Sequence, residues 1–169
     1  MGIPSTLIYC NELIREYEVK NLIRVGSAGA LQPDLKLMDI VIAMSASTNS
    51  SMNSQTFNGS DYAPTANFDL LMQAVNYAEK EQIGFKAGNV LSSDVFYDDD
   101  PDYYKKWASY GVLCVEMESA GLYTLASKYN VNALSILIIS DSLVNGDEIS
   151  SEMREKTLAE MVEIALNCY

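Results

Sequence analysis

Residues 133–139, Ala-Leu-Ser-Ile-Leu-Ile-Ile, form the strongest candidate strand of this chain. Successive side chains of a strand point to opposite faces, and here both sets are almost wholly apolar. Such a strand is expected to be covered on both faces, as in the buried sheet of an α/β protein. Ser140 and Asp141 follow where the apolar run ends.

Further strands and helices alternate with this strand along the chain. Hydrophobic periodicity predicts strands at 21–25, 39–44, 85–91 and 112–115, and helices at about 4–17, 67–84, 103–110, 118–129 and 151–169. Residues 26–29 are predicted to be a small-residue turn, and the serine-rich residues 45–60 a loop. The pattern predicts one α/β domain over residues 1–169, with a mixed, largely parallel central sheet flanked by helices.

The amino-acid composition limits the kinds of molecule that this protein is expected to bind. The chain has 169 residues, the length of a single domain, and 49% of them are hydrophobic, which favours a folded core. Acidic residues outnumber basic ones 23 to 11, for a net charge of −12. This balance disfavours nucleic acid and anionic membranes as partners, and no apolar run approaches the roughly 20 residues of a membrane span. A small anionic ligand needs only one or two arginines, so it remains possible.

The absence of histidine excludes several kinds of site. With 0 histidines, the chain cannot form a Ser–His–Asp or Cys–His catalytic group or a histidine-ligated metal centre. Cys10, Cys114 and Cys168 are too scattered for a disulfide framework or a zinc ribbon, and each lies in an apolar stretch. We therefore predict buried thiols, no metal site and a reducing, cytoplasmic compartment.

Arg24 and Ser27 belong to the first of three groups of polar residues, each at the end of a predicted strand. In Arg24-Val25-Gly26-Ser27-Ala28-Gly29, a glycine turn would expose backbone N–H groups beside a guanidinium and a hydroxyl. Together these donors could hold an oxyanion. The alternative is a tight turn with a surface arginine, and the Gly-Lys-Ser/Thr of a Walker loop does not follow.

Glu116 and Glu118 form the second group, in Val115-Glu116-Met117-Glu118. Alternate residues of a strand share a side, so the two carboxylates are expected to lie together. A carboxylate is a good acceptor for the two neighbouring hydroxyls of a ribose. The alternative is a solvated acidic start of a helix, favoured by the helix dipole.

Ser140 and Asp141 form the third group. An aspartate at the end of an apolar strand could keep its proton near neutral pH and act as a general acid. The alternative is an aspartate that caps the following loop. Phe96, which follows Ser92-Ser93-Asp94, is either a platform for stacking a base or a core residue.

The order of these motifs resembles the purine nucleoside phosphorylases of the hexameric bacterial type, in the nucleoside phosphorylase superfamily. The resemblance rests on residues 24–30, 92–97, 115–120 and 140–141, and it extends over the whole chain. It implies that Arg24 and Ser27 bind phosphate, that Asp141 is the catalytic acid, and that Arg154 helps Asp141 to deliver its proton. The residues that it implies for nucleoside binding are Phe96, Val115, Glu116, Met117, Glu118 and Ser140.

The implied reaction is the phosphorolysis of purine ribonucleosides and deoxyribonucleosides to a free purine base and (deoxy)ribose 1-phosphate. Asp141 would protonate the leaving purine, the phosphate held by Arg24 and Ser27 would attack the sugar, and Glu118 would fix the sugar hydroxyls. Inorganic phosphate is a co-substrate, and no metal or organic cofactor is implied. The resemblance also implies a homo-oligomer.

One departure from the family concerns the start of the chain. Family members carry a substantial stretch ahead of the Met-Gly-Ile-Pro-Ser segment, with further residues of the phosphate site and some strands of the sheet. We expect either an N-terminally truncated member or a misplaced chain start. For a truncated chain, the unpaired sheet edge predicts self-association, and the smaller phosphate site predicts weak phosphorolysis.

Three alternatives remain for the function. A related purine nucleosidase would use water, although a hydrolase has no use for a phosphate-binding Arg24. A uridine phosphorylase fits less well, because an acid facing the base suits a purine ring nitrogen. A catalytically inactive remnant would only bind nucleosides or assemble with other chains.

Overall fold

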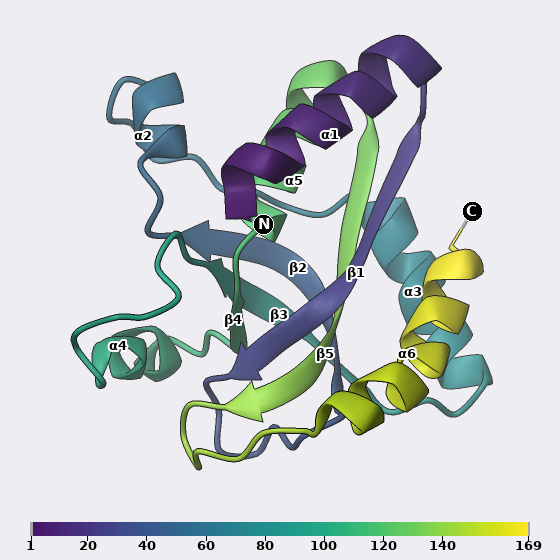
Figure 1. Ribbon diagram of the computed structural model, residues 1–169. Helices are drawn as coiled ribbons and strands as arrows, with labels where there is room; N and C mark the ends of the chain where they lie inside the picture. The colour runs from purple at the N-terminus through teal and green to yellow at the C-terminus, as the bar shows by residue number, and fades with distance from the viewer. Residues whose placement is uncertain (1, 169) are drawn as a thin grey trace.

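Five strands close into a mixed barrel in the computed structural model of the chain, which describes residues 2–168 without the side chains of 151–157 (Figure 1). The strands are β1 (Asn21–Ala30), β2 (Ile40–Thr48), β3 (Phe85–Ser92), β4 (Cys114–Glu116) and β5 (Asn132–Ser142). Their order around the barrel is β1-β4-β3-β2-β5. The pairs β1–β5, β2–β3 and β3–β4 are parallel, and β1–β4 and β2–β5 are antiparallel. The predicted mixed α/β fold is confirmed, whereas the closure of the sheet was not predicted.

The β5 strand lies at the centre of the core, as its composition predicts. Residues 133–140 are all buried. Ala133, Leu137 and Ile139 belong to one hydrophobic cluster, and the alternating Leu134, Ile136 and Ile138 to a second. Both faces of β5 are therefore covered by apolar side chains, so this strand takes part in both hydrophobic clusters.

Helices cover the two sides of the barrel. They are α1 (Gly2–Tyr17), α2 (Met52–Thr56), α3 (Phe68–Lys80), α4 (Tyr103–Ser109), α5 (Ser119–Tyr129) and α6 (Ser151–Leu166). Figure 1 shows α1 beside α5 on one side, with α3 and α6 together on another. Asn67 caps α3, at the start of the helix predicted from residue 67, and its side chain accepts a hydrogen bond from the Leu70 N–H at 3.0 Å. None of the described helices is long and apolar enough to cross a bilayer.

Two segments differ from the sequence-based expectation because strand pairing extends through them. Residues 26–29 are not a turn, since β1 continues to Ala30 and pairs with β5. Residues 45–48 are not loop, since the Ser45 hydroxyl donates to Asn89 on β3 at 2.9 Å and the Asn89 amide donates to Ser47 at 2.8 Å. Polar partners across two strands thus allow β2 to continue where the sequence becomes polar.

Most of one edge of β1 lies outside the barrel pairing. The β4 strand reaches only Gly29 and Ala30. In the part of the chain that the structure describes, residues 21–28 of β1 pair with β5 alone. The short β4 therefore closes the barrel only at the end of β1.

The buried Tyr123 joins α5 to two strands. Its hydroxyl donates to the Ala43 carbonyl on β2 at 2.6 Å and accepts from the Ser135 N–H on β5 at 2.9 Å. Burial is the main reason why the pKa of this hydroxyl lies well above its ordinary value. Tyr123 therefore stays protonated and able to donate at neutral pH.

We predict that Tyr123→Phe lowers the free energy of unfolding by about 1–3 kcal/mol, because two buried backbone groups lose a partner. Urea unfolding of the wild-type and variant chains measures the difference. Tyr17→Phe is the matched control, since Tyr17 is 74% exposed. Equal midpoints for Tyr123→Phe and the wild-type chain would contradict the role of this hydroxyl.

Candidate active site

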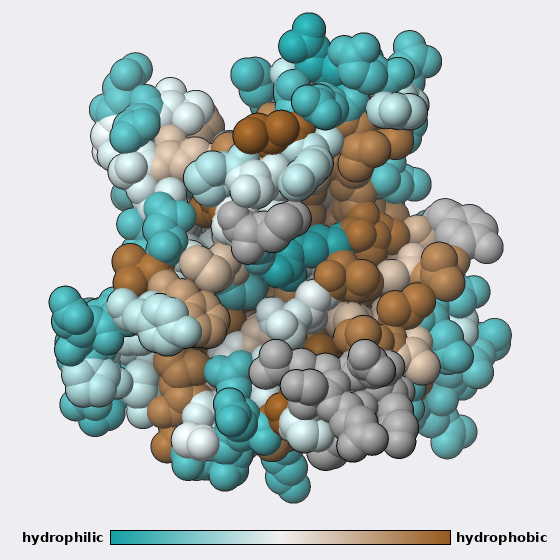
Figure 2. All heavy atoms as spheres, viewed as in Figure 1, coloured by the Kyte–Doolittle hydropathy of each residue, from teal (hydrophilic) through white to brown (hydrophobic). Residues whose placement is uncertain are grey.

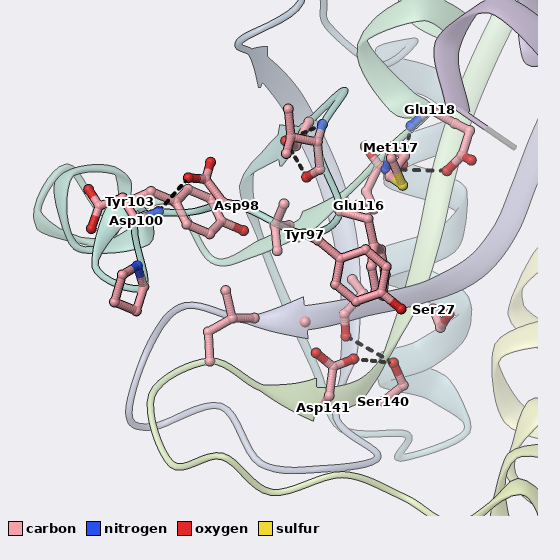
Figure 3. A pocket seen from close by; sticks show the side chains of 18 of the residues that line it. Ser27, Tyr97, Asp98, Asp100, Tyr103, Glu116, Met117, Glu118, Ser140 and Asp141 are labelled. Carbon is pink, nitrogen blue, oxygen red and sulfur yellow. Dashed lines mark hydrogen bonds between the residues drawn. The ribbon is translucent and has the colours of Figure 1, made fainter.

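The predicted site residues come together around one cavity of about 550 Å³ (Figure 3). It is lined by the end of β1, the loop after β3, β4 with the start of α5, and the end of β5. The predicted residues that line it are Arg24, Ser27, Phe96, Val115, Glu116, Met117, Glu118, Ser140 and Asp141. Arg154 belongs to α6, and its side chain lies outside the described residues.

Arg24 forms ion pairs with both glutamates of the Glu-Met-Glu motif. Its Nη2 donates to Oε2 of Glu118 and lies 3.4 Å from Oε2 of Glu116. The Gly2 N–H also donates to Oε1 of Glu118, at 2.8 Å. Burial alone would raise the pKa of Glu118, but the Arg24 charge and the Gly2 N–H bring this pKa below its ordinary value. Glu118 is therefore an anion at neutral pH.

Glu116 is a buried residue at the end of β4, and its carboxylate lies against the start of α5. Its side chain has 0% exposure, and it accepts hydrogen bonds from the Ser92 hydroxyl, from the Glu118 N–H at 2.9 Å and from the Ser119 N–H at 3.0 Å. A carboxylate at this position satisfies N–H groups that have no partner within the helix. Glu116 thus accepts hydrogen bonds from N–H groups at the start of a helix, as the alternative of an acidic helix start predicts. It is buried, however, whereas that alternative predicts a solvated side chain.

The two terminal guanidinium nitrogens of Arg24, Nη1 and Nη2, differ in their hydrogen bonding. Nη1 is buried and has no hydrogen-bond partner within the described part of the chain. A buried donor without an acceptor costs about 1–3 kcal/mol, and more for a charged group. Native proteins keep such groups mainly where an ion, a water molecule or a substrate satisfies them. This donor is the local feature that best fits an oxyanion.

Ser140 and Asp141 both face the cavity because the pairing of β1 with β5 is irregular there. Ala28 pairs with Ile139, but Gly29 pairs with Asp141, so Ser140 is an extra residue in the ladder. The Ser140 hydroxyl donates to Oδ1 of Asp141 at 2.7 Å. Without this bulge, neighbouring residues of the strand would point to opposite faces.

Aromatic residues at the mouth of the cavity extend the predicted set. Phe96 is 73% exposed, so it is not a core residue, and it meets the ring of Tyr97 edge-on at a centroid distance of 4.9 Å. The cavity also has lining residues that sequence reasoning missed: Tyr97, Asp98, Asp100, Pro101 and Tyr103. Only the acidic run at 98–100 marked this segment in the sequence, and it does not distinguish a site from a solvated loop.

The pKa of Tyr103, which lines the cavity, is affected by burial and by two aspartates. Burial raises the pKa of its hydroxyl above the ordinary value, and the charges of Asp98 and Asp141 raise it further. Tyr103 is therefore a protonated hydrogen-bond donor at neutral pH in the lining of this cavity.

The phosphate cradle expected from a glycine turn is not formed by the backbone. Residues 26–29 belong to the extended β1 strand. Successive N–H groups of a strand point in opposite directions and do not converge on one anion as they do in a turn. Binding of an oxyanion here would depend on the side chains of Arg24 and Ser27.

The chain is similar to a known family and to several curated proteins. Residues 1–168 match the family described as the Phosphorylase superfamily. The chain is 61% identical over 166 residues to the purine nucleoside phosphorylase DeoD-type of Thermoanaerobacter sp. (strain X514), covering 98% of this chain and 71% of the relative. It is 56% identical over 167 residues to the protein of the same name from Bacillus cereus (strain B4264), covering 99% and 71%. The chain is 55% identical over 166 residues to the protein of the same name from Clostridium novyi (strain NT).

The Arg24–Glu118 ion pair predicts a pH-dependent stability. Because the folded-state pKa of Glu118 lies below the ordinary 4.5, its contribution is present above that pH and is lost as the pH falls through the folded pKa. We expect Glu118→Gln to be less stable than the wild-type chain by on the order of 1 kcal/mol at neutral pH, and the difference to shrink in acid.

Urea unfolding at pH values well above and well below 4.5 measures this difference. Glu12→Gln serves as the matched control, since Glu12 is exposed on α1. A Glu118→Gln difference of the same size at both pH values would contradict the ion-pair account.

Proposed function

This chain belongs to the Phosphorylase superfamily, and from that premise we propose that it catalyses the phosphorolysis of purine nucleosides. The products would be a free purine base and ribose or deoxyribose 1-phosphate. One observation carries the proposal. An arginine, an ionised glutamate and a serine–aspartate pair lie around a single cavity. These are the groups that a phosphate, a sugar diol and a leaving base require.

Arg24 and Ser27 are proposed to bind phosphate. The buried Nη1 of Arg24 needs an acceptor, and a phosphate oxygen supplies one as a charge-assisted hydrogen bond. The bound dianion then lies where the sugar becomes positively charged in the transition state. It both attacks the anomeric carbon and stabilises that charge.

Glu118 is proposed to bind the sugar hydroxyls. Its ionised carboxylate would accept from two neighbouring hydroxyls, and because it lies beside Arg24, a sugar bound there would lie next to a phosphate on Arg24. Val115 and Met117 line the same cavity and supply apolar contact. Glu116 is proposed to contribute to nucleoside binding from the same segment.

Asp141 is proposed to protonate the purine as it leaves. The bond from the sugar to the base breaks, its electron pair goes to the base, and a proton on a ring nitrogen neutralises that charge. The hydrogen bond from Ser140 fixes the orientation of the carboxyl group. Arg154 is proposed to assist this proton transfer, and the exposed Phe96 to stack on the base.

We also propose a homo-oligomer and a cytoplasmic location. Apolar surface lies over α1 and along β1 (Figure 2), where Ile8, Tyr9, Leu13 and Val25 are exposed. Exposed apolar patches of this kind commonly mark protein interfaces. Cys10, Cys114 and Cys168 are free thiols, which suits a reducing compartment.

The proposed reaction needs inorganic phosphate but no metal or organic cofactor. Incubation of inosine or adenosine with the purified chain, with and without phosphate, tests it directly. We predict release of free base only when phosphate is present, together with formation of the sugar phosphate. Release without phosphate would indicate a nucleosidase, and no release would indicate a catalytically inactive chain that only binds nucleosides or assembles with other chains. Either result would contradict the proposal.

A second prediction concerns the acid. We expect Asp141→Asn to lower kcat on natural purine nucleosides by roughly 10²–10⁴-fold, since general acid catalysis is worth about that much. Nucleosides whose leaving group needs no proton should lose much less. Asp61→Asn, at an exposed aspartate outside this cavity, is the control. Equal losses on both kinds of nucleoside would count against Asp141 as the acid.

A further inference from the structure

Two glycines of β1 lie directly against two side chains of the candidate active site. An added Cβ at Gly26 would lie 2.7 Å from Nη1 of Arg24, and one at Gly29 would lie 2.7 Å from Oδ2 of Asp141. Cβ atoms do not approach other heavy atoms so closely, so a side chain at either position would force its neighbour to move. No positive backbone φ is recorded at these two glycines. The need for glycine at these two positions is therefore explained by the space that a missing side chain leaves.

Gly26 leaves room for the guanidinium of Arg24. The two residues are separated by one position on β1, so their side chains share a face of the strand. An added Cβ would also lie 2.9 Å from Cζ and 3.0 Å from Nη2 of Arg24. The guanidinium thus lies over the backbone of Gly26, and any other residue there would force the guanidinium to move.

Gly29 leaves room for the carboxyl group of Asp141. The two residues pair directly across β1 and β5, immediately after the bulge at Ser140. An added Cβ would meet Oδ2 of Asp141, and it would also lie 2.6 Å from Cδ1 of Leu143. The bulge turns Asp141 toward the cavity, and the missing side chain at Gly29 lets the carboxyl group lie there.

We propose that Gly26 and Gly29 are positioning residues for two different parts of the reaction. Gly26 holds open the position of Arg24 and so controls phosphate binding. Gly29 holds open the position of Asp141 and so controls proton transfer to the leaving base. This inference rests on the proposed phosphorolysis, and it replaces the phosphate-binding turn that the glycine-rich sequence first suggests.

Gly26→Ala and Gly29→Ala test the proposal, because they should change different kinetic constants. Small displacements of catalytic groups can cost about a hundredfold in rate. We expect Gly26→Ala to raise KM for phosphate by about tenfold to a hundredfold with a smaller effect on kcat. We expect Gly29→Ala to lower kcat by a similar factor, with KM for phosphate little changed. With a nucleoside whose base needs no proton, the Gly29→Ala loss should largely disappear.

Two further glycines provide matched controls. Gly88→Ala, on β3, creates a similar close contact, 2.8 Å from Cδ1 of Leu113, away from the cavity. In Gly84→Ala, the added Cβ would meet no atom of the described residues within 4 Å. Both control variants should keep the kinetic constants of the wild-type chain. The proposal is overturned if Gly26→Ala and Gly29→Ala change kcat and KM in the same way, or if Gly88→Ala reproduces their effects.

Crystal structures of the two variants separate this inference from the proposed function. If the wild-type chain shows no phosphate-dependent release of base, the proposed reaction fails on that result alone. The positioning inference then depends on the structures: Arg24 should leave Glu118 in Gly26→Ala, and Asp141 should leave Ser140 in Gly29→Ala. Side chains that stay in place in both variants would overturn it.

Discussion

The parallel pairing of β1 with β5 is the interaction on which the rest of the structure depends. It extends from Asn21↔Asn132 to Ala30↔Ser142 and joins two strands that are far apart in the sequence. The pairing is held in register by the apolar side chains of β5, which are buried on both faces. Because both strands run in the same direction, Ser27 and Asp141 reach one end of the barrel, where ligands bind in α/β sheets.

The charged groups of the site are stable only as a set. Arg24 is 18% exposed, and the Glu116 side chain is fully buried, so each would be costly without the other. The N–H groups at the start of α5 and the Ser92 hydroxyl satisfy Glu116, which in turn lies beside Arg24. Among the residues that the structure describes, Nη1 of Arg24 still has no acceptor. An unsatisfied donor in an otherwise matched network is a feature expected of a binding site.

The sequence was informative where composition and position determine structure. An almost wholly apolar run predicts the buried β5, and Asn67 predicts its helix start, because both depend on local chemistry. The polar groups at 24–27, 116–118 and 140–141 were recognised as candidate sites because they lie at the ends of predicted strands. Barrel closure was not predictable, since β4 has only three residues and pairs through long-range contacts. The glycines at 26 and 29 suggested a turn, because sequence alone does not show which side chain a missing Cβ accommodates.

The most direct test of the central claim is a crystal structure of the chain with phosphate and an uncleavable purine nucleoside analogue. The account predicts both ligands in the cavity between β1, β4 and β5. Phosphate should contact Arg24 and Ser27, the sugar hydroxyls should contact Glu118, and the base should face Asp141. Ligands bound elsewhere, such as in the cavity of about 510 Å³ beside Ser45 and Pro64, would contradict it.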